Sequence, residues 1–208
     1  MSLKQNVVDL VTQSTLKAFG KLEGLSMLEL GNQIGMGTTG KEYWTSKGMN
    51  HTSVDLNGRT GSIVKDLSKL EDFNDMLESF DVVYNSGTSE HVEPFQAQYT
   101  CFKIMDAVTR KNGVIINLVP DVLRRDIGGH LTDHCHYYYS TDFFDTLIQE
   151  SKYEKIVVEL DTRIVKASYI KTDSSKFMED QTLFNSKIAI RNLEKDFSQN
   201  DDYIFQNK

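Results

Sequence analysis

The chain has 208 residues, 39% of them hydrophobic and 25% charged, a balance typical of a globular domain with a sizeable core. No apolar run approaches the roughly 20 residues that a membrane-spanning helix needs, and residues 1–6 lack the basic-then-apolar layout of a signal peptide. The net charge of −7 argues against a nucleic-acid partner, because such partners usually bind a basic face.

The cysteines indicate the cellular compartment, and the distribution of charge indicates the class of binding partner. The two cysteines, Cys101 and Cys135, form neither a disulfide framework nor a CxxC pair, so a reducing cytoplasm is the expected compartment. Lysines and arginines are scattered among more numerous acids, which favours a small molecule or a modest protein acceptor as the partner. The sequence does not indicate an oligomeric state.

Strands and helices are predicted to alternate over most of the chain. Apolar side chains at helical spacing predict helices, and short β-branched apolar runs predict strands. The first elements are a helix at 4–19, a strand at 26–30, a helix at 38–47 and strands at 51–55 and 62–65. A helix at 70–77, a strand at 80–84, a helix at 92–110 and a strand at 114–119 follow. This order is typical of a parallel sheet covered by helices.

Several helix boundaries have their own signals. Gly20 is suited to end the first helix, because glycine readily adopts the left-handed conformation of a helix C-terminus. Thr38 or Thr39 can cap the second helix, and Thr141 can cap a later one. Asn112-Gly113 is a turn pair that should end the long helix before it.

The last two predicted strands form a hairpin. Residues 153–160 and 163–170 are apolar and β-branched, and only Asp161 and Thr162 separate them. Two-residue links join antiparallel neighbours, because a parallel pair needs a much longer crossover. The expected fold class is therefore α/β, with a mainly parallel, helix-flanked sheet and one antiparallel strand.

The chain is predicted to form one domain, residues 1–208, in which one segment precedes the sheet and another follows it. Residues 1–20 should form an N-terminal helix that packs on the main body. Residues 172–208 form a polar C-terminal extension, in which 183–190 could be a further strand or a docked helix.

Polar residues gather where the predicted strands end. Ligands of such sheets lie beyond the carboxyl ends of the strands, where the strand order reverses. The residues at those ends are Glu29 to Gly31, Asp55, Asp66 and Asn85-Ser86-Gly87. A glycine turn lets the backbone pass close to a ligand, and a later carboxylate can accept hydrogen bonds from both hydroxyls of a ribose. The pattern predicts a nucleoside site.

Residues 25–170 resemble the class I S-adenosylmethionine-dependent methyltransferases. The resemblance is carried by LELGNQIG at 28–35, VDL at 54–56, VKDL at 64–67, FDVVYN at 80–85 and GVIIN at 113–117. It implies a Rossmann-like three-layer sandwich, whose mostly parallel seven-stranded sheet ends in an antiparallel hairpin, and S-adenosyl-L-methionine as cofactor.

The resemblance also assigns roles around the nucleoside. Asp55 would take the ribose hydroxyls, with Leu56 against the adenine. Asp66 would accept from the adenine amino group, while Leu67 supplies a backbone donor. Asn85 and Ser86 would line the mouth near the reactive methyl group.

At the methionine end, the resemblance implies that the glycine turn passes under the cofactor and that Glu29 helps to hold its ammonium group. The turn residues concerned are Gly31, Asn32, Gln33 and Gly35. The family usually has glycine at the position of Gln33, and Gly37 lies beyond the usual window, so a longer or differently shaped turn is expected here.

Two other functions share parts of this pattern. An NAD(P)-dependent Rossmann oxidoreductase also has a glycine turn and an acid, but Glu29 would disfavour its diphosphate, and Tyr99 and Lys103 lie on the wrong helix for a catalytic Tyr-x-x-x-Lys arrangement. A non-catalytic nucleoside-binding α/β scaffold is the third hypothesis. A glycine turn alone occurs in many α/β proteins without a nucleotide, and an acid such as Asp55 can simply cap a helix.

Direct methyl transfer to oxygen or nitrogen of a small-molecule acceptor is the expected reaction. A hydroxyl acceptor usually needs a base, and the candidates are His91, Glu90 and His134. Ser89 and Glu90 could instead cap and charge the start of a helix. His134 and His136 could hold a metal with Asp121 or His130, but no spacing is diagnostic and no metal is expected.

Overall fold

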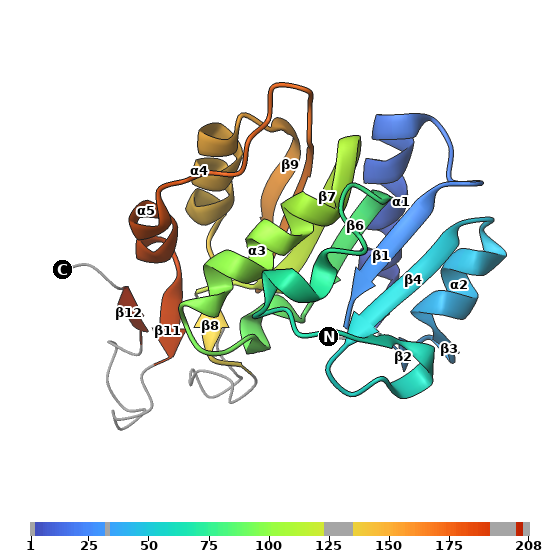
Figure 1. Ribbon diagram of the computed structural model, residues 1–208, viewed down its shortest axis with the longest axis horizontal. Coiled ribbons are helices and arrows are strands. Elements are labelled where there is room, and N and C mark those ends of the chain that lie inside the picture. The colour runs from blue at the N-terminus through green and yellow to red at the C-terminus, as the bar shows by residue number, and fades with distance from the viewer. Residues whose placement is uncertain (1–2, 32–33, 123–134, 192–202, 206–208) are drawn as a thin grey trace.

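The computed structural model describes residues 3–31, 34–122, 135–191 and 203–205 (Figure 1). Its main feature is a seven-stranded sheet in the order β5-β4-β1-β6-β7-β10-β9. The strands are β1 (Ser26–Leu30), β4 (Asn50–Asp55), β5 (Ile63–Val64), β6 (Phe80–Ser86), β7 (Thr109–Pro120), β9 (Glu154–Asp161) and β10 (Ile164–Ile170). The pairings from β5 through β7 are parallel, whereas β10 is antiparallel to both β7 and β9. The mostly parallel sheet with its terminal hairpin is confirmed.

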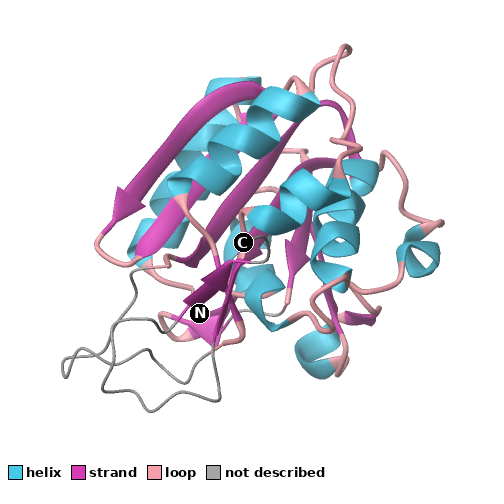
Figure 2. Ribbon diagram, turned by 90° about the vertical axis from the view of Figure 1, so that its left-hand side faces the viewer, coloured by secondary structure: helices cyan, strands magenta, loops and turns pink. Residues whose placement is uncertain are grey.

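Helices cover both faces of this sheet, which makes three layers (Figures 1 and 2). The helices α1 (Gln5–Phe19) and α2 (Gly40–Ser46) pack on one face, and α3 (Ala97–Val108) and α4 (Thr141–Ser151) pack on the other. Successive strand residues alternate between two hydrophobic clusters, with Met27 under α1 and Leu28 under α3. Among the described residues, no helix has both the length and the apolar character needed to cross a membrane.

Shorter elements lie around the sheet. They are the hairpin β2 (Ile34–Gly35) and β3 (Thr38–Thr39), the helix α5 (Gln181–Ser186), and the small sheet of β8 (Tyr137–Tyr138), β11 (Ala189–Arg191) and β12 (Tyr203–Phe205). Single 3₁₀ turns occur at Arg59–Gly61, Leu70–Phe73 and Ser89–His91. The segment predicted as either strand or helix at 183–190 thus contains the end of α5 and the start of β11.

Two predicted helices are shorter than their patterns indicated. The helix predicted at 70–77 is only the 3₁₀ turn Leu70–Phe73, because so short an apolar run cannot offset the cost of starting an α-helix. The helix predicted at 92–110 begins at Ala97, since Pro94 disfavours helical geometry at the residue before it. Its turn pair, Asn112-Gly113, lies inside β7, which starts at Thr109.

The helix caps agree closely with the sequence. Thr39 accepts from the backbone N–H of Glu42, and the Glu42 carboxylate accepts in return from the backbone N–H of Thr39, a complete capping box. Gly20 ends α1 in the left-handed conformation, at a φ of 69°. Before α4 the cap is Ser140 rather than Thr141, because the hydroxyl of Ser140 is the one that reaches the backbone N–H of Phe143.

Candidate functional site

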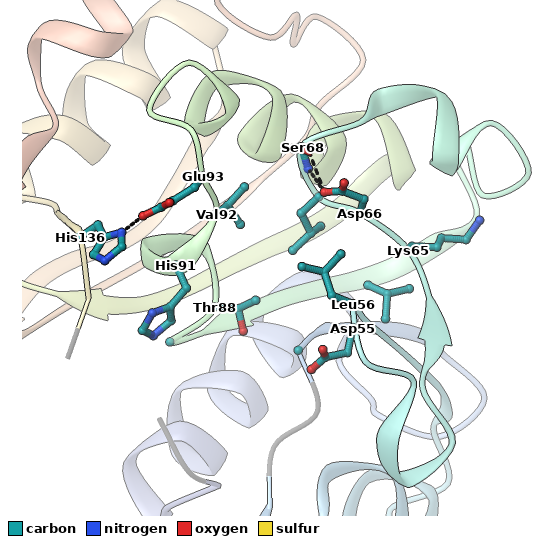
Figure 3. Close-up of a pocket in the computed structure, with 14 residues that line it drawn as sticks. Asp55, Leu56, Lys65, Asp66, Ser68, Thr88, His91, Val92, Glu93 and His136 are labelled. Carbon is teal, nitrogen blue, oxygen red and sulfur yellow. Dashed lines mark hydrogen bonds and ion pairs between the residues drawn. The ribbon is translucent and has the colours of Figure 1, made fainter.

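A cavity of about 510 Å³ lies at the carboxyl ends of β1, β4 and β6 (Figure 3). Strand β1 has β4 on one side and β6 on the other, so the strand order reverses at this point. The lining residues are Gly31, Val54, Asp55, Leu56, Lys65, Asp66, Leu67, Ser68, Gly87, Thr88, His91, Val92, Glu93 and His136. Of the residues predicted at the strand ends, Gly31, Asp55, Asp66 and Gly87 line this cavity.

Gly31 makes the glycine turn possible at the base of the cavity. Its backbone has a φ of +75°, and its N–H donates to the carbonyl of Val54 at 2.8 Å. A Cβ at this position would overlap the hydroxyl of Thr88, which donates to the carbonyl of Leu30 at 2.7 Å. Only glycine fits both the backbone conformation and the contact with the loop after β6.

The segment after Gly31 is a hairpin rather than a short turn. Met36 and Gly37, between β2 and β3, have φ values of 51° and 75°, the positive pair typical of a type I′ turn. This explains why Gly37 lies beyond the family's usual window. Gly35 does not line the cavity; it lies against the backbone of Leu3, which a Cβ would overlap. Asn32 and Gln33 lie outside the described residues.

Asp55 and Leu56 line one side of the cavity, directly after β4. The Asp55 carboxylate accepts from the backbone N–H of Asn57 at 3.1 Å, which leaves further acceptor positions for a ligand. Leu56 is 69% exposed beside it, so its apolar side chain is accessible to a molecule bound in the cavity.

Asp66 adds a second carboxylate to that side, next to Leu67. One of its oxygens accepts from both the hydroxyl and the backbone N–H of Ser68, at 2.7 and 2.9 Å. The Ser68 hydroxyl is the main reason why the pKa of Asp66 lies below its usual value, so this group is ionised near neutral pH.

The cavity has more anionic than cationic character. The Lys65 side chain extends away from it (Figure 3), and its ammonium donates to the Asp75 carboxylate at 2.7 Å and to the Asp72 carbonyl. Among the described residues, no arginine lines the cavity. A cationic ligand is therefore better suited to this cavity than a diphosphate.

Beyond Thr88, the other side of the cavity carries His91, Val92, Glu93 and His136 (Figure 3). The Nδ1 atom of His136 contacts a carboxylate oxygen of Glu93. Sequence reasoning proposed His91, placed Thr88 in the same loop without giving it a role, and missed Glu93. Only Pro94, which favours an extended backbone at Glu93, was a signal for that residue.

Besides Gly35, four predicted site residues do not line the cavity. Glu29 is fully buried on the α2 side of the sheet, with its Oε2 atom 2.8 Å from Nε2 of His51. Asn85, Ser86 and Glu90 are also fully buried. Asn85 shapes the loop instead, since its side-chain oxygen accepts from the backbone N–H groups of Thr88 and Ser89.

The remaining predictions concern the 120–139 segment. His134 and His130 lie outside the described residues. Within the described part of the chain, no group of three or more histidine, cysteine, aspartate or glutamate side chains is arranged to hold a metal ion.

Comparison with known proteins gives a result for structure but not for sequence. No family model and no curated protein sequence matches the chain. A methyltransferase of Burkholderia thailandensis, solved with 1,6-didemethyltoxoflavin and S-adenosylhomocysteine, matches with a TM-score of 0.57 at 14% identity over 81% of this chain and 82% of that one.

Two further solved structures support the same fold. A SAM-dependent methyltransferase of Aquifex aeolicus has a TM-score of 0.55 at 13% identity, over 81% of this chain and 94% of that one. One from Methanosarcina mazei has a TM-score of 0.54 at 13% identity, over 83% and 99%. The chain therefore has the Rossmann-like fold of the class I S-adenosylmethionine-dependent methyltransferases.

Proposed function

We propose that this protein is an S-adenosyl-L-methionine-dependent methyltransferase that transfers a methyl group to oxygen or nitrogen of a small-molecule acceptor. The observation that carries the proposal is the cavity at the reversal of strand order, with Asp55 and exposed Leu56 on one side and a histidine-bearing mouth on the other. The proposal covers the chain as a single domain in the cytoplasm, where Cys101 and Cys135 would stay free thiols.

The residues of the cavity fit this cofactor. Asp55 would accept from the ribose hydroxyls, with Leu56 against the adenine, and Asp66 would accept from the adenine amino group, next to the backbone of Leu67. Gly31 would lie under the methionine part. The cofactor would supply an electrophilic methyl group on a positively charged sulfur. The chain's own part is to bind and orient the two molecules and to exclude water.

Glu29 needs a different role from the one first assigned to it. Its carboxylate is paired with His51 and does not face the cavity, so it does not distinguish an ammonium from a diphosphate there. The distinction now depends on Asp55 and on Asp66, whose Oδ2 atom lies 3.2 Å from the Lys69 ammonium, and on the Lys65 ammonium being turned toward Asp75. The antiparallel strand β10 also disfavours a nicotinamide-dependent oxidoreductase, whose sheet would normally continue with parallel strands.

A small-molecule acceptor is supported by a structural match and by the residues at the mouth of the cavity. The Burkholderia thailandensis methyltransferase, which has a similar fold, was solved with bound 1,6-didemethyltoxoflavin and S-adenosylhomocysteine. His91 lines the mouth of the cavity here and stays a candidate base. Glu90 is buried beneath the mouth, so we give it a supporting role at most.

Calorimetry with S-adenosylmethionine, S-adenosylhomocysteine and oxidised nicotinamide dinucleotide tests the proposal. We expect roughly micromolar affinity for the two sulfur nucleosides and none for the dinucleotide. Binding of the dinucleotide alone would overturn it. A screen of small acceptors, followed by release of S-adenosylhomocysteine, then separates an enzyme from a non-catalytic nucleoside-binding scaffold, which would bind the cofactor without turnover.

A further inference from the structure

The mouth of the cavity contains a histidine and a glutamate whose side chains contact each other. The Nδ1 atom of His136 contacts an oxygen of Glu93, and both residues line the cavity on the side of Thr88 away from Asp55 (Figure 3). Their side chains are 49% and 52% exposed, respectively. The imidazole is therefore accessible to a molecule bound in the mouth.

Anchored backbone supports both members of the pair. The backbone N–H of His136 donates to the Glu90 carbonyl at 3.3 Å, and the next two residues form β8, which pairs with β11. On the other side, the buried Gln98 amide donates to the carbonyl of Val92, next to Glu93, at 2.7 Å. The pair is thus held between α3 and the small sheet.

The contact determines which nitrogen of the imidazole can act as a base. A carboxylate only accepts hydrogen bonds, so the proton of neutral His136 must lie on Nδ1, where Glu93 accepts it. The lone pair then lies on Nε2, the nitrogen away from Glu93. A carboxylate behind an imidazole also stabilises the imidazolium that forms when Nε2 takes up a proton.

We propose, on the basis of the methyltransferase function above, that Glu93 and His136 form the general base of this site. Nε2 of His136 accepts the proton from the acceptor oxygen or nitrogen, and the freed lone pair forms the new bond to the methyl carbon. The methyl–sulfur bond breaks, and its electron pair stays on sulfur. His136 touches the acceptor, whereas Glu93 is a positioning residue that acts through His136.

This assignment narrows the acceptor class. An imidazole removes protons efficiently only from groups whose acidity is not far from its own, because proton transfer follows the difference in pKa between donor and base. Phenols, enols and the N–H groups of electron-poor heteroaromatic rings meet this condition, and aliphatic alcohols do not. We infer that the acceptor is a small ionisable phenol, enol or heteroaromatic N–H compound.

The first test needs neither cofactor nor acceptor. Long-range proton–nitrogen NMR of ¹⁵N-labelled protein reports which imidazole nitrogen carries the proton, and His136→Gln identifies the signal of this residue. We expect His136 to be protonated on Nδ1 in the wild type and mainly on Nε2 in Glu93→Ala, as in a solvent-exposed neutral histidine side chain. Protonation on Nε2 in the wild type overturns the proposal.

The second test compares turnover on catechol, 8-hydroxyquinoline and xanthine with turnover on 1-butanol. We expect activity only on the ionisable acceptors, with His136→Gln lowering kcat by roughly 10²–10⁴-fold and leaving the affinity for S-adenosylmethionine unchanged. Glu150→Ala, on the exposed face of α4, is the control. Full activity of His136→Gln, or a loss that follows only His91→Gln, overturns the base assignment. Failure of the wild type to bind the cofactor would instead overturn the methyltransferase function.

Discussion

The carboxylate of Glu29 and the imidazole of His51 form a fully buried pair, with 2.8 Å between Oε2 and Nε2. Glu29 lies on β1 and His51 on the neighbouring β4, so the pair joins two adjacent parallel strands of the sheet. The indole N–H of Trp44, on α2, donates to the hydroxyl of the buried Tyr84 in the same layer, at 3.3 Å. Burial raises the pKa of Tyr84 well above its usual value, so it stays a neutral phenol.

Removing His51 should destabilise the protein strongly. His51→Ala removes the imidazole nitrogen that contacts the buried Glu29 carboxylate, and the loss of such a partner of a buried polar group typically costs about 1–3 kcal/mol, more where the group is charged. His51→Gln keeps a hydrogen-bond donor and should cost less. Urea unfolding followed by circular dichroism measures both variants. A cost for His51→Ala no greater than that of His51→Gln would show that the pair is energetically unimportant.

Gly31 should not tolerate a side chain. Gly31→Ala combines the strain of a non-glycine residue at a φ of +75°, roughly 1–2 kcal/mol, with an overlap between its Cβ and the Thr88 hydroxyl. Gly37→Ala is a matched control, because Gly37 has the same φ but nothing within 4 Å of the position of its Cβ. The difference between the two unfolding free energies therefore isolates the overlap with Thr88.

The consequence for the site can be tested with the same two variants. Gly31→Ala should also weaken binding of S-adenosylmethionine in calorimetry, since Gly31 lines the cavity and Gly37 does not. Equal stability and equal affinity of the two variants would contradict the role given to the Gly31–Thr88 contact.

The sequence predicted the fold well because its strongest signals are local. Thr162 and Arg163 alone link β9 to β10, one residue later than the sequence predicted, and a link so short leaves the antiparallel arrangement as the only choice. The positions of Asp55 and Leu56 were likewise predictable, because both residues lie at the carboxyl end of a parallel strand, where ligands of such sheets bind. Gly37 was recognised as out of place, and the type I′ turn of the hairpin is the reason.

The parts of the site that depend on distant partners were not predictable in this way. Glu29 was placed at the cofactor by motif, but it lies on the same sheet face as Met27, and its partner His51 is on another strand. The alternation of β1 could have indicated this orientation. The contact between Glu93 and His136 joins the loop after β6 to the start of β8, and no local pattern encodes such a contact.

Ser68 should control the ionisation of Asp66. The Ser68 hydroxyl holds the pKa of Asp66 below its usual value of 3.8, so the folded state binds this proton less tightly than the unfolded state. The resulting stabilisation is complete above pH 3.8 and is lost as the pH falls through the lower value of the folded protein. Ser68→Ala should therefore raise the pKa of Asp66, as carboxyl NMR would show. Ser46→Ala is the control, because its hydroxyl donates to the Tyr43 carbonyl. If the pH midpoint of the Asp66 carboxyl titration were the same in Ser68→Ala as in the wild type, the role given to the Ser68 hydroxyl would be wrong.

Asp55 should contribute to cofactor affinity without contributing much to stability. Asp55→Ala removes a charged acceptor from the proposed ribose hydroxyls, which should weaken binding of S-adenosylhomocysteine by roughly 1–3 kcal/mol, or about 5- to 150-fold. In the folded protein the Asp55 carboxylate accepts from the exposed backbone N–H of Asn57, and the loss of this exposed hydrogen bond should change the unfolding free energy little. Asp145→Ala, which removes an exposed ion pair between Asp145 on α4 and Lys155 on β9, is the matched control and should leave affinity unchanged. Calorimetry with the demethylated cofactor measures the effect without the need for an acceptor. If Asp55→Ala bound as tightly as Asp145→Ala, the ribose could not lie at the end of β4, and the nucleoside site would have to be sought elsewhere in the chain.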